Sequence, residues 1–598
     1  MRTGYLYRII AIILLLLFSL QVLLSIPYKS PIFDEPLNLA RGYVYVATGS
    51  KAAIAHPALM FTISSFPLLF LNLNLSDSYN HYLMVGDYLT MGQEIFYTAN
   101  NNADMVFYVS RLPLLLLGVV LGIYVYIWAK KLYGRKAGLF ALFLYSFNPL
   151  ILGNTPLIMT DLIFTAFGFI SVYYLWKFLS GGKLLDLLLT GIAIGLAQVS
   201  KFTALFLVPL YLLLIFFSAY DFSFRIFFRE LIYKNRIKKL VSLAFPILIM
   251  LVLIIFVINI AYGFDGIFKS TEARIKGDST LQFDKEYFMP DAVAGRLTSN
   301  PAIRSGVSIV LNYLPSILPY GYIKDVVSVV RANTPSLEGS VSGSFLMGEY
   351  SDKGWWYFYL FALLIKTPIP LLIFILLSLV SFFILKFRSN YEIFLIGPIL
   401  MFFIYFSSFY RVQTSRYVLS LFPFLFVFTS RILSDRVKIS RLFILSIILL
   451  SSWYVAESIS AFPNYTTYFN QIIGGPSNGY KYLQGTDLDA GQDLPLLAKY
   501  VRNNKITNLK LAYYGTPDPF YYLDFTCLAC PVCHPDIISK CPEKCEPTEG
   551  MVAVSASLLQ NIPQEKNRNC FDWLKSYEPI EKVGYTIFVY NISDIASS

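Results

Sequence analysis

Residues 9–41 of the chain read IIAIILLLLFSLQVLLSIPYKSPIFDEPLNLAR, an apolar run followed by an acidic pair. The run over residues 9–26 nearly reaches the ~20 apolar residues that a helix needs to cross a hydrocarbon core of ~30 Å. Arginines precede it, as in a signal peptide, but no Ala-x-Ala-like cleavage site follows. We therefore expect a transmembrane helix, with Asp34 and Glu35 just beyond its end.

The composition of the whole chain is that of a membrane protein. Of its 598 residues, 56% are hydrophobic and only 14% are charged, which a single water-soluble core of this size does not carry. Apolar runs that reach or nearly reach the length of a span begin near Leu6, Leu112, Ala137, Leu162, Leu184, Phe202, Val241, Tyr357, Glu392, Tyr417 and Leu442. We predict an α-helical polytopic membrane protein with about eleven transmembrane helices.

Basic residues indicate its orientation. The net charge of +11 comes from short Lys and Arg clusters in alternate loops, so nucleic acid is not an expected partner. Because such loops stay in the cytoplasm, we expect the N-terminus inside and the C-terminal part outside. The sequons at Asn74, Asn464 and Asn591 all fall in segments that this topology places outside. The last residues carry no retention motif, which favours a cell (cytoplasmic) membrane over an organelle.

The predicted topology divides the chain into two domains. Residues 1–461 form the transmembrane domain, with external loops at about 27–111 and 263–356, and loops this long are usually functional. Residues 462–598 form a small extracytoplasmic domain. Strand-like runs at 509–514, 551–555 and 586–590 surround a helix-like stretch at 494–501, which indicates an α/β fold.

All six cysteines lie in the external domain, at Cys527, Cys530, Cys533, Cys541, Cys545 and Cys570. An even number of cysteines outside the cytoplasm favours disulfides. With His534 beside Cys533, the same spacing is also compatible with a structural zinc or an iron–sulfur cluster. In each case we expect a structural site rather than a catalytic one.

Two acidic positions are candidates for catalysis. Asp34 and Glu35 lie at the membrane surface, where a carboxylate can act as a general base. The alternative is an ordinary helix start, with Asp34 as the N-cap and Pro36 in the first turn. Asp161 lies at an external turn among apolar residues, where an ionisable group indicates function, although it too can simply cap a helix.

Four basic residues lie at or near the external helix ends, namely Lys201, Lys366, Arg411 and Arg416. Lys366 is about ten residues inside its apolar run, or ~15 Å at helical rise, so we expect it to need an anion or a water-filled cavity. Acids and cations together suit a reaction in which a hydroxyl loses a proton and a phosphate leaves. A glycolipid transporter or flippase is the alternative, and a scaffold that presents its external domain is a third reading. The hairpin at Lys201 has no counterpart in the second half, which argues against the inverted repeats of a transporter.

At these residues the sequence resembles the membrane glycosyltransferases of the GT-C fold, within them the dolichyl-phosphate-mannose protein mannosyltransferase and aminoarabinose-transferase-like group. The resemblance covers nearly the whole chain. The similar motifs are Asp34-Glu35, His56-Pro57, Arg111, Met159-Thr160-Asp161, Ser200-Lys201-Phe202-Thr203, residues 345–350, residues 353–356, Lys366-Thr367-Pro368, residues 468–470, residues 474–479 and residues 487–493. Ala490 stands where relatives often have tryptophan, a difference that affects one packing contact.

The resemblance implies a donor in which a hexose or pentose is linked to a dolichyl- or undecaprenyl-type phosphate. It also implies inverting transfer outside the cytoplasm to a protein, lipid or glycan acceptor. Asp34 would be the general base, Glu35 would orient it or simply cap the helix, and the four cations would bind the donor phosphate. Asp161 would hold a divalent cation (Mg or Mn) together with Asp34, or would bond to the sugar or a lysine. The remaining substrate and loop residues are His56, Arg111, Glu349, Trp355 and Trp356. For the two tryptophans, an interfacial aromatic belt is an equal alternative.

Overall fold

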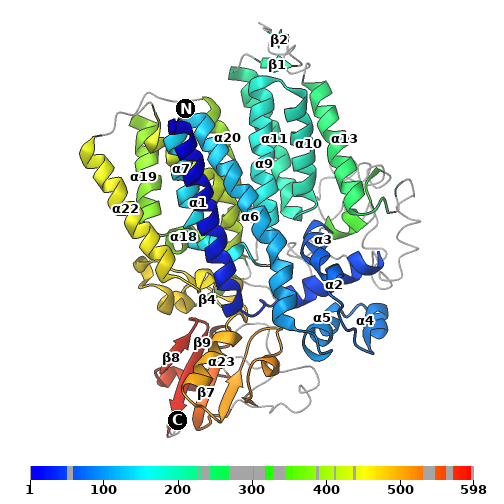
Figure 1. The fold of residues 1–598 in the computed structure, drawn as a ribbon, viewed down its shortest axis with the longest axis vertical. Coiled ribbons are helices and arrows are strands. Elements are labelled where there is room, and N and C mark those ends of the chain that lie inside the picture. Colours follow the sequence, from blue (N-terminus) through cyan, green and yellow to red (C-terminus); the bar gives the residue numbers. More distant parts are fainter. Residues whose placement is uncertain are drawn as a thin grey trace. The chain divides into compact units, whose positions relative to one another are not determined.

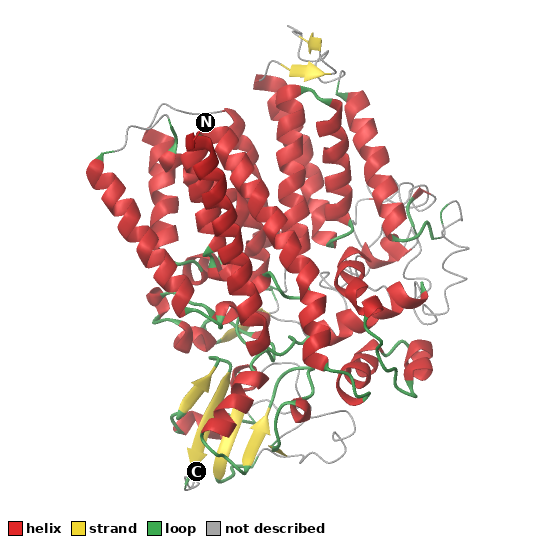
Figure 2. Ribbon diagram, viewed as in Figure 1, coloured by secondary structure: helices red, strands yellow, loops and turns green. Residues whose placement is uncertain are grey.

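The computed structural model describes most of the chain, and its helices and strands are shown in Figures 1 and 2. It describes residues 2–593 except 50–57, 222–223, 227–228, 232–242, 266, 268–300, 302–316, 320, 327–343, 352, 385–389, 410–412, 436–439, 529–545 and 561–569. The chain divides into two compact units. The first contains residues 1–43, 63–166 and 341–598, and the second contains residues 44–62 and 167–340. The predicted external domain, residues 462–598, therefore lies within the first unit.

Helices dominate both units, and each predicted apolar run coincides with a helix. The helices of the first unit's membrane part are α1 (Arg2–Ser25), α6 (Ala103–Tyr133), α7 (Arg135–Ser146), α8 (Pro149–Asn154), α18 (Phe358–Lys366), α19 (Ile369–Ile384), α20 (Ile393–Phe409), α21 (Phe422–Thr429) and α22 (Arg441–Ser460). Helix α9 (Thr160–Gly181) begins in the first unit and continues in the second, which also contains α10 (Leu184–Gln198), α11 (Leu207–Asp221) and α13 (Ala244–Ala261).

Six of the described helical segments are long and apolar enough to cross a membrane, and the bent pair α18 and α19 makes a seventh if it counts as one span. Four shorter apolar helices, at Ala58–Phe70, Leu184–Gln198, Phe202–Phe217 and Ile393–Ser408, accompany them. Many of their large apolar side chains are exposed, as lipid-facing side chains are. The chain is an integral membrane protein.

Small residues allow the helices to approach closely within each unit. In the first unit, a Cβ on Gly122 of α6 would lie 2.9 Å from the Tyr145 ring of α7. The Tyr145 hydroxyl donates a hydrogen bond of 2.5 Å to the Gly118 carbonyl on the same face of α6. In the second unit, a Cβ on Gly195 of α10 would lie 2.7 Å from Val257 of α13. Small residues at interfaces are the usual route to tight packing between membrane helices.

The helix that carries Lys366 breaks at that point. Helices α18 and α19 meet at an angle of 117°. Thr367 between them is extended because the residue before a proline, here Pro368, is pushed out of the α region. Asn470 donates to the carbonyls of Leu364 and Thr367 at the break, and Lys366 is the last residue of α18.

Short helices follow α1 in the sequence. They are α2 (Glu35–Thr48), α3 (Ala58–Ser65), α4 (Tyr79–Val85) and α5 (Tyr88–Gln93). Helix α2 begins directly at the acidic pair. A later two-stranded hairpin of β3 (Ser344–Leu346) and β4 (Glu349–Ser351) precedes α18.

The C-terminal part of the first unit contains the predicted α/β fold (Figure 2). Its sheet has the order β6-β5-β7-β9-β8, with β5 parallel to β6 and β7, and β9 antiparallel to β7 and β8. The strands are β5 (Leu509–Ala512), β6 (Thr526–Cys527), β7 (Gly550–Ser555), β8 (Glu581–Val583) and β9 (Ile587–Ile592). The apolar face of α23 (Leu494–Asn503) packs on this sheet through Leu494, Leu497 and Val501. The predicted fold class is confirmed, with helices throughout the membrane part and a small sheet near the C-terminus.

Candidate active site

Asp34 lies in the turn that starts α2. The Asn38 amide donates to the Asp34 carbonyl at 3.0 Å, so Asp34 occupies the N-cap position by its backbone. Its side chain is half-buried, and no hydrogen bond or ion pair joins its carboxylate to any residue that the structure describes. An N-cap carboxylate that does not cap its helix is available for another contact.

Glu35, the next residue, has the opposite environment. Its carboxylate is completely buried and forms an ion pair with Arg111, from which Nη2 donates at 2.7 Å and Nε at 3.2 Å. It also accepts from the backbone amides of Ile32 at 2.7 Å and Ile158 at 2.9 Å. Asn38 of the same helix donates to the Ile158 carbonyl at 3.1 Å. Glu35 and Asn38 therefore tie the start of α2 to the turn that precedes Asp161.

Asp161 and Arg416 lie close together. Asp161 is in the first turn of α9, and its Oδ2 lies 3.8 Å from Nη1 of Arg416, an ion pair beyond hydrogen-bond length. Both side chains are largely buried. Nε and Nη1 of Arg416 have no hydrogen-bond partner among the described residues. A buried guanidinium with unused donors is suited to a bidentate anion such as phosphate.

Asp34, Asp161 and Asp487 all act electrostatically on Arg416. The structure therefore brings together three of the predicted site residues, Asp34, Asp161 and Arg416, which come from different parts of the chain. The site contains an unpartnered acid, a cation with free donors and a second acid that faces the cation.

The ammonium of Lys366 contacts backbone oxygens, which differs from the predicted contact with an anion. It is buried, and its Nζ donates to the carbonyls of Asp487 at 2.5 Å and Thr466 at 3.0 Å. The Phe469 ring covers it at 3.8 Å. Carbonyl dipoles and an aromatic face replace the water that a buried ammonium loses. These contacts are those of a structural lysine, and the phosphate contact of Lys366 stays a prediction.

The structure gives the following positions for the remaining predicted site residues. Lys201 is half-buried before the 3-10 turn Phe202–Phe206 of the second unit, while His56 and Arg411 lie outside the described residues. Glu349 is exposed on β4. The backbone amide of Trp355 donates to the Gln413 side chain at 2.8 Å, and Trp356 is 69% exposed just before α18.

The described residues do not fit a divalent cation. No group of three or more His, Cys, Asp or Glu side chains among them is arranged to hold a metal ion. Asp161 faces a guanidinium, whose positive charge occupies the place next to this acid. We therefore derive no step through a metal.

Two of the six cysteines, Cys527 and Cys570, fall in the described part of the chain, and both are disulfide-bonded. Cys530, Cys533, Cys541 and Cys545 lie outside it, as does His534.

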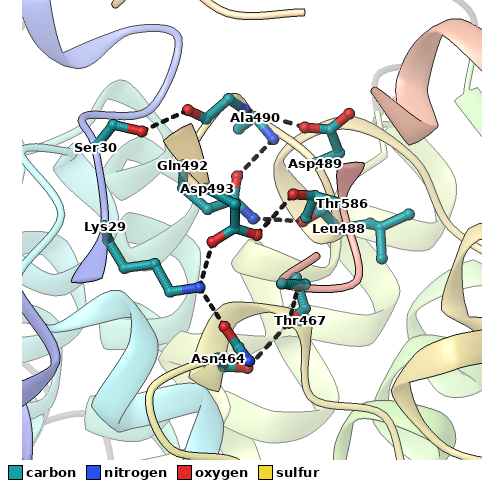
Figure 3. A network of polar contacts seen from close by, with 12 residues as sticks. Lys29, Ser30, Asn464, Thr467, Leu488, Asp489, Ala490, Gln492, Asp493 and Thr586 are labelled. Carbon is teal, nitrogen blue, oxygen red and sulfur yellow. Dashed lines mark hydrogen bonds and ion pairs between the residues drawn. The ribbon is translucent and has the colours of Figure 1, made fainter. Parts of the chain in front are cut away.

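Sequence reasoning missed a polar network that surrounds residues 487–493 (Figure 3). Lys29 forms an ion pair of 2.5 Å with Asp493, and Asp487 accepts from the Ser415 amide at 2.8 Å. Burial raises the pKa of Asp493, an effect that Lys29 opposes, and raises the pKa of Asp489 to about 7. The only signal was the resemblance of residues 487–493 to a family motif, which gave no role to the individual residues.

The fold and site define a polytopic helical membrane protein with a C-terminal α/β part and a site of acids and a cation at helix ends. Residues 103–262 match the dolichyl-phosphate-mannose-protein mannosyltransferase family. This segment contains Arg111, Asp161 and Lys201, and the match confirms the predicted resemblance over these residues. No curated protein matches the chain in sequence.

Solved structures also show similarity at low identity. One is ArnT from Cupriavidus metallidurans bound to undecaprenyl phosphate, with 11% identity, a TM-score of 0.47 and full coverage of both chains. Another is the apo Archaeoglobus fulgidus oligosaccharyltransferase, with 14% identity and a TM-score of 0.40 over 75% of this chain and 56% of that chain.

Proposed function

We propose that this chain is a glycosyltransferase that moves a hexose or pentose from a polyprenyl-phosphate carrier to an acceptor hydroxyl. Transfer takes place on the external side of a cell membrane, with the N-terminus in the cytoplasm. The observation that carries the proposal is the unpartnered carboxylate of Asp34 near the Arg416 guanidinium, whose Nε and Nη1 make no hydrogen bond within the described part of the chain. One group can accept a proton and the other can bind an anion. The family match over residues 103–262 supports a donor of this class.

Asp34 is the general base of the proposed reaction. The acceptor oxygen attacks C1 of the sugar while its proton passes to the Asp34 carboxylate. The bond between C1 and the phosphate oxygen breaks, its electrons leave with polyprenyl phosphate, and the configuration at C1 inverts. The half-buried position of Asp34 supports this role because its carboxylate has no hydrogen bond within the described residues and can accept the proton of a bound hydroxyl.

Arg416 stabilises the charge that develops on the leaving phosphate. Asp161 lies too far from Nη1 for a strong hydrogen bond, so it orients the guanidinium and leaves the donors available. Glu35 is enclosed by Arg111 and two amides, so we assign it a positioning role. Lys201 and Arg411 are proposed as further phosphate contacts.

The remaining predicted residues are proposed to lie on the sugar and acceptor side of the site. His56, Glu349 and Trp355 are proposed to contact the sugar or the acceptor, which is a protein, a lipid or a glycan. The exposed indole of Trp356 fits an interfacial position.

Donor binding tests the proposal separately from turnover. Purified protein in nanodiscs is titrated with a polyprenyl phosphate, and wild type is compared with Arg416→Gln. The control is Arg502→Gln, which removes an exposed arginine of α23. We expect Arg416→Gln to weaken binding at least about tenfold, since a charge-assisted bidentate contact contributes more than ~1.4 kcal/mol. Equal affinity in the two variants, with both proteins folded, would refute the assignment of Arg416.

A further inference from the structure

Residues 487–493, here called the Asp487–Asp493 loop, contact both arms of the candidate site. One arm is the segment 30–33 that leads into Asp34. The other is the turn Thr414-Ser415 that leads into Arg416. These arms are about 380 residues apart in the sequence, and the same seven residues hold each of them.

The first arm pairs with the loop through backbone and side-chain contacts (Figure 3). The Ser30 amide donates to the Gln492 carbonyl and the Phe33 amide to the Ala490 carbonyl, both at 2.9 Å. The Ser30 hydroxyl donates to the Gly491 carbonyl at 2.8 Å. Three hydrogen bonds over four residues fix the backbone immediately before Asp34.

An ion pair fixes the start of the same arm. Lys29 donates to Oδ1 of Asp493 at 2.5 Å and to the side chain of Asn464. The other oxygen of Asp493 accepts from the Thr586 hydroxyl at 2.6 Å. Asp493 therefore links Lys29, the residue before the first arm, to Thr586, the residue before β9.

The second arm is held by the carboxylate of Asp487. It accepts from the Ser415 amide at 2.8 Å and 2.9 Å and from the Thr414 hydroxyl at 2.5 Å. Ser415 is the first residue of the 3-10 helix Ser415–Leu421, in which Arg416 is the second residue. Asp487 thus fixes the turn from which the guanidinium extends, and its own carbonyl accepts from Lys366.

The loop itself is anchored in the C-terminal part by the short helix α24 (Ala556–Leu559) and by the residue that follows β5. Asp489 accepts from the Ser557 amide at 2.9 Å, and the Tyr513 hydroxyl donates to the Gly491 carbonyl at 2.5 Å. Gly491 has a φ of +88°, and a Cβ there would lie 2.4 Å from the Tyr513 hydroxyl. Only glycine fits this position without strain, and the hydrogen bonds of its neighbours hold the loop against both arms.

We propose that the Asp487–Asp493 loop is a positioning element that sets the placement of the Asp34 carboxylate relative to the Arg416 guanidinium. Asp487 positions the cation and Asp493 positions the acid. This inference rests on the proposed function. It gives the C-terminal part a role in the reaction through its contacts with the membrane part, because a shift of about 1 Å in either group reduces the rate strongly.

Two variants separate the two arms. In Asp487→Asn, an amide nitrogen takes the place of one of the carboxylate oxygens that accept hydrogen bonds from Thr414 and Ser415. The change therefore disturbs the placement of Arg416. We expect at least a tenfold loss of affinity for a polyprenyl phosphate. Asp493→Asn weakens the hold on Lys29 and disturbs the placement of Asp34, so we expect kcat to fall at least tenfold while phosphate affinity changes less than threefold. Asp572→Asn, which removes an exposed ion pair with Lys575 in the same part of the chain, is the control and changes neither quantity.

A milder variant covers the case in which Asp487→Asn does not fold. Thr414→Val removes one donor from Asp487 and leaves the Ser415 amide in place, and we expect a threefold to tenfold loss of phosphate affinity. Wild-type affinity in a folded Asp487→Asn or Thr414→Val protein would overturn the positioning role of Asp487. Wild-type kcat in Asp493→Asn would overturn that of Asp493. If Arg416→Gln also binds phosphate normally, the assignment of Arg416 in the proposed function fails. If Arg416→Gln alone weakens binding, only the positioning role is refuted.

Discussion

Removing the charge of Glu35 should destabilise the protein more than removing the charge of its neighbour Asp34. Glu35 is fully buried, and its carboxylate accepts from two nitrogens of Arg111 and from two backbone amides. Glu35→Gln leaves the buried guanidinium without a counter-ion and turns one acceptor oxygen into a donor. Breaking a buried pair in this way costs ~3–5 kcal/mol. Asp34→Asn changes a half-buried group with no partner in the described residues, so we expect a change within about 0.5 kcal/mol.

The assay is unfolding of the purified variants in lipid bicelles, by denaturant titration and by thermal melting. The double variant Glu35→Gln/Arg111→Met removes the stranded cation as well. It should recover at least ~1 kcal/mol relative to the sum of the single changes, because residues in direct contact are not additive. A Glu35→Gln protein as stable as Asp34→Asn would refute the structural role of the ion pair.

Three other expectations follow from buried polar groups. Burial raises the pKa of Asp489 from 3.8 to about 7, so between these pH values the folded protein keeps a proton that the unfolded chain has released. The free energy of unfolding should therefore fall as pH rises through this window. It should depend less on pH in Asp489→Asn than in wild type, and a wild-type free energy of unfolding that does not change with pH would contradict this. Lys366→Met leaves two carbonyls without their donor and should cost roughly 1–3 kcal/mol of stability. Its affinity for a polyprenyl phosphate should stay at the wild-type value, and weakened binding in a folded variant would support the predicted phosphate contact. Gly491→Ala places an alanine at a positive φ with its Cβ against the Tyr513 hydroxyl, and should lower the free energy of unfolding by about 1–3 kcal/mol. A melting temperature equal to that of wild type would show that the loop can adapt.

The elements of the fold were predictable because their signals are local. Apolar runs predicted the helices of the membrane part, although six of the described segments, or seven with the bent pair, are long and apolar enough to cross a membrane, fewer than the eleven expected. Strand-like runs predicted β5, β7 and β9 of the C-terminal sheet. The break between α18 and α19 could have been predicted from Thr367-Pro368, since a residue before proline leaves the helical region.

The candidate site was predictable only in part. Asp34, Asp161 and Arg416 could be singled out because a charge among apolar residues is costly unless it has a function. Lys366 meets the same criterion, yet it bonds to carbonyls that are 100 and 121 residues away in the sequence. A single sequence contains no information about such distant partners. The different environments of Asp34 and Glu35 likewise depend on Arg111, which is 76 residues away from Glu35.

The measurement that tests the central claim most directly is sugar transfer by purified protein from a panel of radiolabelled polyprenyl-phosphate monosaccharides. Wild type is compared with Asp34→Asn, and polyprenyl-phosphate binding and thermal melting serve as controls for folding. The account predicts transfer or hydrolysis with at least one donor, and a loss of at least about a hundredfold in Asp34→Asn with unchanged phosphate binding, as removal of a general base gives. Turnover in Asp34→Asn at the wild-type rate, or no turnover by folded wild type with any donor, would contradict it.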